Sequence, residues 1–88
     1  MVWTIELTST ATRQLAKLDK AVAQRIRRFL PQRIAPLENP RILGQKLHGK
    51  LEEFWKYRIG DYRIIVRIED DRLVVLVIQI GHRREIYR

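Results

Sequence analysis

The sequence contains no cysteine, which excludes a disulfide framework and a thiolate metal site. Its only imidazoles belong to His48 and His82, too few for a convincing zinc site, and we expect neither a metal nor another cofactor. No apolar run approaches the roughly 20 residues of a membrane span. The first residues also lack the basic and long apolar regions of a signal peptide, so we expect a soluble cytoplasmic protein without membrane contacts.

Acidic residues are scarce. The chain has 10 Asp and Glu against 18 Lys and Arg, which gives a formal charge of +8. Seven basic and three acidic residues precede residue 41, and eleven and seven follow, so both parts carry +4 and the charge is not confined to a tail. A small basic domain is typical of proteins that bind nucleic acid or an acidic partner protein. A charge that serves only solubility is the simpler alternative, but either sign would serve that purpose.

The 88 residues allow one domain, residues 1–88, with a single core and little surplus stability. Apolar periodicity predicts a strand, two helices and then three strands. Pro31 should kink or shorten the second helix near Phe29, and the prolines and glycines of residues 36–50 predict a loop. The expected elements are a strand at residues 2–7, helices at about 11–18 and 20–34, a hairpin at 54–67 and a strand at 73–80.

This β-α-α-β-β-β order predicts an α+β fold, in which a helical hairpin packs on one face of a four-stranded antiparallel sheet. Residues 84–87 could add a short fifth strand. In residues 73–80, apolar residues occupy both the odd and the even positions. This predicts a central strand that is covered on both faces.

The hairpin carries the most informative pattern. Gly60-Asp61 suits a two-residue type II′ turn, which sets Arg58 directly opposite Arg63. Opposed arginines repel by roughly 1 kcal/mol, and a bound polyanion would remove this cost. Because side chains alternate along a strand, the basic residues that share one face are Lys56, Arg58, Arg63 and Arg67. The residues of the other parity, which we expect to form core, are Trp55, Tyr57, Ile59, Tyr62, Ile64, Val66 and Ile68.

The end of the chain holds a second pattern. Arg83 and Tyr87 are four residues apart, so they can share a face whether this segment is extended or helical. If they share the basic face of the hairpin, three strands converge on one pocket. The alternative, in which each is an ordinary terminal residue, is favoured for either residue alone. Together with the opposed arginines, the functional interpretation becomes the better one.

Taken in order, three features resemble the RelE family of toxins, from the RelE/ParE group of toxin-antitoxin systems. They are the β-α-α-β-β-β order, the Trp-Lys-Tyr-Arg-Ile-Gly-Asp-Tyr-Arg of residues 55–63 and the Ile-Gly-His-Arg-Arg-Glu-Ile-Tyr of residues 80–87. The resemblance, which covers almost the whole chain, implies a metal-free, ribosome-dependent endoribonuclease that cuts mRNA in the ribosomal A site. It also implies an acidic, RelB-like antitoxin as partner, in a complex of higher order. The catalytic residues implied by motif are Lys56, Arg58, Arg63, Arg83 and Tyr87, and the further RNA contacts are Arg67, His82 and Arg84.

The implied chemistry suits these residue types. Cleavage of RNA by its own 2′-hydroxyl needs a base, positive charge at the phosphorane and a donor for the 5′ oxygen. Arginine cannot be the base because it stays protonated in proteins. Neighbouring cations favour tyrosinate, so Tyr87 is the candidate base, with Lys56 as the alternative or assisting group. Arg63 and Arg83 would clamp the phosphate, and either Arg58 or Arg83 would face the leaving oxygen.

Two other functions fit part of the same pattern. A ParE-like toxin would share the scaffold but poison DNA gyrase without cutting RNA, and the presence of all five implied catalytic residues argues against it. A non-catalytic RNA-binding or ribosome-binding module would use its cations only to neutralise phosphate. Its binding would weaken with salt as steeply as that of the enzyme, so only product chemistry separates the two.

Overall fold

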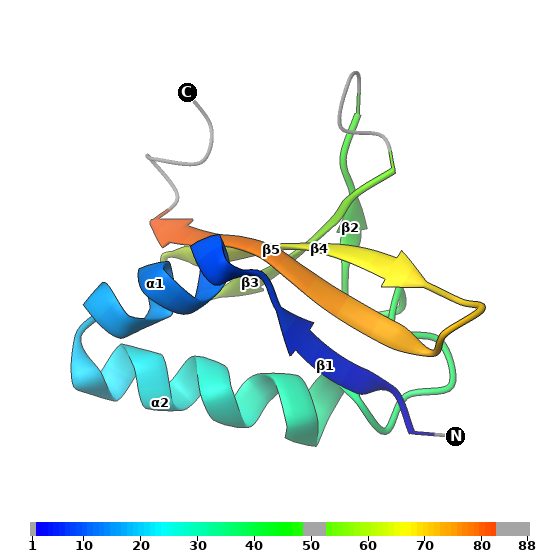
Figure 1. Ribbon diagram of the computed structural model, residues 1–88, viewed down its shortest axis with the longest axis horizontal. Helices are drawn as coiled ribbons and strands as arrows, with labels where there is room; N and C mark the ends of the chain where they lie inside the picture. Colours follow the sequence, from blue (N-terminus) through cyan, green and yellow to red (C-terminus); the bar gives the residue numbers. More distant parts are fainter. Residues whose placement is uncertain (1, 49–52, 83–88) are drawn as a thin grey trace.

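The computed structural model describes residues 2–48 and 53–82. Figure 1 shows two helices against one face of a twisted sheet, and the sheet has five strands in the order β1-β5-β4-β3-β2. The predicted α+β class and the helical hairpin are confirmed. The elements are β1 (Thr4–Leu7), α1 (Ser9–Lys17), α2 (Lys20–Phe29), a π-helical turn (Leu30–Ile34), β2 (Gln45–Lys46), β3 (Trp55–Ile59), β4 (Tyr62–Glu69) and β5 (Val74–His82).

The sheet is mixed, so the prediction of a purely antiparallel sheet is wrong in this respect. β1 runs parallel to β5, whereas the other neighbouring pairs are antiparallel. Two helices and three strands separate β1 from β5 along the chain, so no tight turn dictates an antiparallel pairing. The fifth strand is β2, inside the segment predicted to be a loop, because two residues are too few to show an alternating pattern. The optional strand at residues 84–87 lies outside the described residues.

The β3–β4 hairpin has the predicted register, with Arg58 opposite Arg63. Gly60 has a φ of 58°, and among the described non-glycine residues only Leu73 has a positive φ. Asp61 therefore has a negative φ, which fits a type II′ turn and excludes type I′. The turn and the alternation that follows from it decide which hairpin residues meet the helices and which lie on the opposite face.

A single residue accounts for the start of α1, and another accounts for the end of α2, which Pro31 shortens as expected. Thr8 Oγ1 accepts a hydrogen bond from the Ala11 N–H at 3.1 Å, which caps α1, and donates to the Ile78 carbonyl oxygen at 3.0 Å, which ties α1 to β5. α2 stops at Phe29, and Pro31, which has no N–H to donate, lies in the π-helical turn that follows.

No helix in residues 2–48 and 53–82 combines the length and the apolar character needed to cross a membrane.

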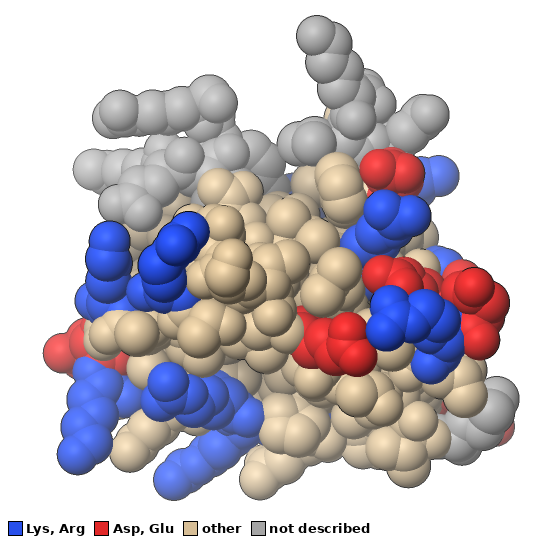
Figure 2. Space-filling view, in the orientation of Figure 1, with Lys and Arg blue, Asp and Glu red and all other residues tan. Residues whose placement is uncertain are grey.

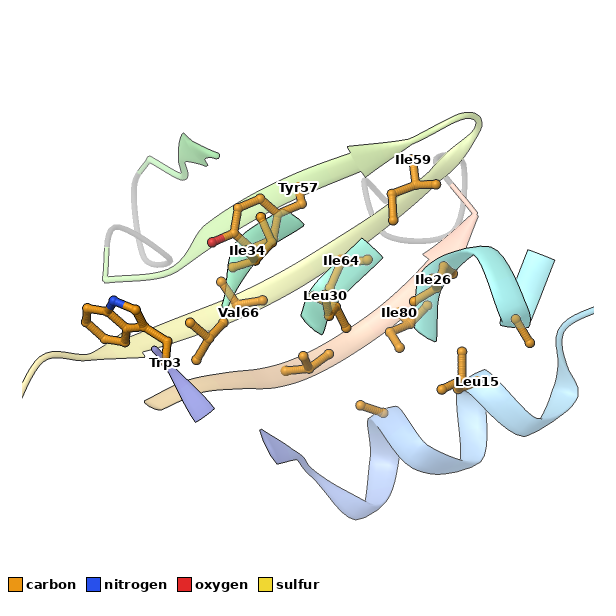
Figure 3. Packing of buried hydrophobic residues seen from close by; sticks show 14 residues of the cluster. Trp3, Leu15, Ile26, Leu30, Ile34, Tyr57, Ile59, Ile64, Val66 and Ile80 are labelled. Carbon is orange, nitrogen blue, oxygen red and sulfur yellow. The ribbon is translucent and has the colours of Figure 1, made fainter. Parts of the chain in front are cut away.

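The core lies between the helices and one face of the sheet (Figure 3). β5 is central, as predicted, and a β-bulge explains its unbroken apolar run. Because the pairing with β4 skips Ile78, both Val77 and Ile80 face the core although they are three residues apart. The expected cover on both faces of β5 is incomplete, since Leu76 and Ile78 are only half-buried.

The aromatic residues predicted as core differ in burial. Trp3 and Tyr57 are buried in the cluster, and Trp55 packs half-buried against it. Tyr62 is half-buried at the far end of the hairpin, where its ring meets that of His82 edge to face.

Tyr57 connects the core to the segment that precedes β2. Its ring packs edge to face against Phe29, with centroids 5.9 Å apart, and its hydroxyl donates to the Pro40 carbonyl oxygen at 2.6 Å. Both Tyr57 and Pro40 are fully buried. Burial raises the pKa of the Tyr57 hydroxyl far above its ordinary value, so the group stays a neutral donor.

We predict that Tyr57→Phe lowers the free energy of unfolding by about 1–3 kcal/mol, because the Pro40 carbonyl would remain buried without this donor. Chemical denaturation followed by tryptophan fluorescence measures the change. Tyr62→Phe is the matched control, since it removes a hydroxyl from a half-buried ring of the same hairpin, and we expect a change within about 0.5 kcal/mol. Equal effects of the two substitutions would contradict an anchoring role for the Tyr57 hydroxyl.

Candidate functional site

Three basic residues of the hairpin meet in one pocket. The pocket has a volume of about 250 Å³, and alternation along β3 and β4 places it on the face of the sheet opposite the helices. Its lining residues are Leu43, Gln45, Lys56, Arg58 and Arg63. Three of the four basic side chains that alternation assigns to this face therefore line one pocket and can act on one bound group, together with two residues from the preceding segment.

Strand register explains how the pocket is assembled. Residues directly opposite each other in neighbouring strands present their side chains on the same face. Gln45 is opposite Lys56 across β2 and β3, and Arg58 is opposite Arg63 across β3 and β4. On the other side of Arg63 stands Gly81 of β5, which has no side chain to occupy the face beside the guanidinium. Two adjacent cross-strand rows thus supply all the residues that line the pocket except Leu43.

The two opposed arginines differ in depth. Arg63 is only 7% exposed, whereas Arg58 is exposed and its Nε donates to the Gly60 carbonyl oxygen at 3.4 Å. Lys56 is half-buried. A guanidinium presents its N–H donors in a planar fork that matches the oxygens of a phosphate, and an ammonium adds a compact positive charge. The pocket can therefore bind a phosphate group through two guanidinium groups and one ammonium group.

The segment before β2 is held against the sheet by Arg41. Its guanidinium donates to the two carboxylate oxygens of Asp70 at 2.9 and 2.6 Å and lies 5.8 Å from the centre of the Trp55 ring. Asp70 belongs to the β4–β5 turn, at the opposite end of β4 from Gly60. The segment that supplies Leu43 and Gln45 to the pocket is thus tied to β3 and to a distant turn.

Sequence analysis did not single out Leu43 and Gln45. They lie in a segment with neither strand nor helix periodicity, and neither residue type is diagnostic of a site. The signal that was available is Gly44 between them, because glycine marks places where the backbone approaches another group closely.

Two further predicted site residues, Arg67 and His82, are not among the described residues that line the pocket. Arg67 is exposed on β4 with the parity of Arg63. His82 pairs with Tyr62, with ring centroids 5.5 Å apart, and this pair has the parity of the core face, so His82 points away from the pocket. Three predicted residues, whose approach to the pocket stays a prediction, lie outside the described part of the chain: Arg83, Arg84 and Tyr87.

A second basic surface covers the helices. Figure 2 shows Lys and Arg gathered over α1 and α2, while most acidic residues lie on the other side of the view, around the β4–β5 turn. Asp19 is the only acidic residue between Ser9 and Ile34. Within the described ranges, no group of three His, Asp or Glu could hold a metal ion. The exposed basic residues of the helical layer are Arg13, Lys17, Lys20, Arg25, Arg27, Arg28 and Arg33.

Comparison with known proteins gives consistent matches along the chain. A family model described as "ParE toxin of type II toxin-antitoxin system, parDE" matches residues 5–87. Toxin RelG of Mycobacterium tuberculosis is 31% identical over 88 residues, covering 100% of this chain and 99% of the relative. The mRNA interferase toxin RelE of Escherichia coli is 30% identical over 90 residues, covering 99% of this chain and 92% of the relative. The crystal structure of the toxin-antitoxin complex RelBE2 from Mycobacterium tuberculosis superposes with a TM-score of 0.86 at 28% identity, covering 94% of this chain and 93% of the other.

The contact between Arg41 and Asp70 predicts a pH dependence. The hydrogen bond from Arg41 holds the pKa of Asp70 below its ordinary value, so the pair stabilises the fold above the unfolded pKa of about 4 and loses its effect as the pH falls through the folded pKa. We therefore expect Asp70→Asn to destabilise the protein at pH 7 and to match the wild type near pH 2. The effect should stay below about 1 kcal/mol, because the pair is solvent-exposed.

Thermal unfolding at low ionic strength across this pH range measures the difference. Asp71→Asn is the control, since it removes the same charge one residue away. A difference between wild type and Asp70→Asn that does not change with pH would contradict the assigned ion pair.

Proposed function

The chain belongs to the RelE/ParE family of type II toxin-antitoxin toxins, and from this premise we propose that it is a ribosome-dependent endoribonuclease that cuts mRNA in the ribosomal A site. The observation that carries the proposal is the pocket in which Lys56, Arg58 and Arg63 meet. A relative that is 30% identical over 90 residues is an mRNA interferase, which is consistent with this chemistry.

In the proposed mechanism, the pocket binds the scissile phosphate. Arg63, which is buried and held between two strands, would stabilise the charge that develops on the phosphorane. Arg58, which is exposed, would approach the leaving 5′ oxygen or share the phosphate. Lys56 can lose a proton, unlike the arginines, so it would assist the base or replace it. The attacking group is the 2′-hydroxyl of the RNA itself.

We propose Tyr87 as the base that takes the 2′-hydroxyl proton. The chain has three tyrosines, and the other two are poor candidates for this role. The Tyr57 hydroxyl is bonded to a buried carbonyl, and burial raises its pKa. Tyr62 has the parity of the core face. Arg83 would join Arg63 at the phosphate, while His82, which points toward the core side, has no assigned step.

The basic surface over α1 and α2 supports a site surrounded by RNA. The pocket and the helices lie on opposite faces of the sheet, so positive charge faces outward on both sides. Such a protein can contact mRNA on one face and ribosomal RNA phosphates on the other. The same charge would attract an acidic, RelB-like antitoxin, and a solved structure with a TM-score of 0.86 to this chain is a toxin-antitoxin complex. We propose such an antitoxin as the partner, in a complex of higher order.

A ParE-like activity is the second candidate, because the matching family model carries the ParE description. It predicts gyrase-dependent DNA breaks without cleavage of mRNA. A non-catalytic binding module predicts neither DNA breaks nor RNA ends that carry a 2′,3′-cyclic phosphate. Mapping of cut ends on ribosome-bound mRNA, combined with a gyrase cleavage assay, therefore separates all three functions.

We predict that Arg63→Ala slows cutting of mRNA on programmed ribosomes by about 10²–10³-fold, because a preorganised donor to the phosphorane is lost. Arg63→Lys keeps the positive charge but loses the planar set of N–H donors, so its cutting rate should lie between those of Arg63→Ala and the wild type. Naked RNA should stay largely intact with every variant.

The control for these variants is Arg72→Gln, which removes a positive charge from the ion pairs of the β4–β5 turn, far from the pocket. Thermal unfolding shows whether the buried position tolerates each substitution. Wild-type cutting by a folded Arg63→Ala protein would remove Arg63 from the mechanism.

We also predict that Tyr87→Phe slows cutting by about 10²–10⁴-fold, because the proposed base loses its hydroxyl. Arg83→Ala should cause a loss of at least similar order at the phosphate. Tyr62→Phe is the control, because it removes a tyrosine hydroxyl from the core side of the hairpin. This variant should cut at close to the wild-type rate. Unchanged cutting rates in both Tyr87→Phe and Arg83→Ala would contradict the proposed mechanism.

A further inference from the structure

Two of the residues that line the pocket are not cations. Leu43 is 42% exposed, so an apolar rim stands beside the charged groups. A phosphate gains nothing from contact with a leucine side chain. An exposed apolar side chain gains free energy when another apolar surface covers it. The rim therefore suits a ligand that has an apolar face next to its phosphate.

Gly44 brings this rim to the pocket. A Cβ atom on Gly44 would lie 3.1 Å from Cε1 of Tyr57 and 3.2 Å from the carbonyl oxygen of Lys56. The backbone can approach β3 this closely because glycine has no side chain. The residues on either side, Leu43 and Gln45, are thereby set along the strand that carries Lys56 and Arg58.

Gln45 adds a hydrogen-bonding group at a defined place. It belongs to β2 and stands directly opposite Lys56, and such cross-strand neighbours have Cβ atoms about 4.5–5.5 Å apart. Its amide offers both a donor and an acceptor. In a nucleotide the base and the phosphate are joined through one ribose, so a base lies next to its own phosphate. An anion could use only the donor of this amide, whereas the edge of a base can use both the donor and the acceptor.

We propose that Leu43 and Gln45 form a nucleobase subsite beside the phosphate pocket. The inference rests on the proposed cleavage of mRNA and identifies which part of the nucleotide this rim reads. The face of an unstacked base packs on Leu43, and the edge of the base forms hydrogen bonds with the Gln45 amide. A glutamine amide pairs best with the donor and acceptor of adenine, so the subsite favours adenine beside the cut.

The test measures single-turnover cutting on ribosomes that carry mRNAs with each of the four bases, in turn, at the two nucleotides flanking the wild-type cut. Gln45→Met keeps the length of the side chain but removes both hydrogen-bonding groups. We expect it to reduce the preference for adenine over the poorest base by about tenfold, with little change for the poorest base. Leu43→Ala should slow cutting at all four bases by about fivefold, because every base has an apolar face to cover.

Ile42→Ala is the matched control, since it removes an exposed apolar side chain next to the rim that does not line the pocket. It should keep both the rates and the base preference of the wild type. Three results would overturn the subsite while leaving the proposed function intact. The wild type could show no base preference. The Gln45→Met variant could keep the wild-type preference, or it could cut more slowly by the same factor at all four bases. A wild type that cuts no mRNA on ribosomes would overturn the proposed function and the subsite together.

Discussion

Side-chain alternation across the β3–β4 hairpin is the constraint on which the rest of the structure depends. It sets Tyr57 and Ile64 against the helices and places Lys56, Arg58 and Arg63 on the opposite face. A slip of one residue would exchange the two sets, which would bury the charges and expose the core. The same free energy of apolar burial that folds the sheet therefore holds the cationic pocket in register.

Tyr57 extends this constraint from the core to the rim of the pocket. Its ring packs against Phe29 within the core, and its hydroxyl holds the Pro40 carbonyl. Gly44 packs closely on the same ring, since a Cβ atom there would lie 3.1 Å from Tyr57 Cε1, which is tighter than an ordinary contact. The segment before β2 is irregular, but its position is determined by contacts with a buried side chain. Loss of packing around Tyr57 would consequently be felt at the pocket, although Tyr57 does not line it.

Local chemistry made much of this structure predictable. The turn at Gly60 and the alternating pattern predict the register that brings Arg58 and Arg63 together, and Pro31 predicts where α2 ends. The parts that escaped prediction depend on contacts between distant residues. β2 has two residues and exists because it pairs with β3, while the parallel partner of β1 is set by packing and not by a turn.

The bulge at Ile78 is the feature that is hardest to predict from the sequence, and it decides on which face of the sheet His82 lies. Simple alternation from Val77 would place His82 on the face of the pocket, but the skipped residue reverses the parity of the remainder of β5. His82 accordingly pairs with Tyr62 on the core side. No pattern in the apolar run of residues 73–80 marks the bulge, because branched residues occupy both parities there.

The two opposed arginines show how the fold limits the cost of a cationic site. Arg63 is buried between β3 and β5, whereas Arg58 stays in solvent near the Gly60 carbonyl, so water screens at least one of the two charges. A guanidinium already fixed by burial loses little conformational freedom when it binds an anion, and an exposed partner can move to meet it. Repulsion between the two charges opposes folding, and in the proposed function a phosphate bound by both guanidinium groups would offset this repulsion. In the proposed function, the fixed position of Arg63 would help to hold the phosphate in the geometry that cleavage requires.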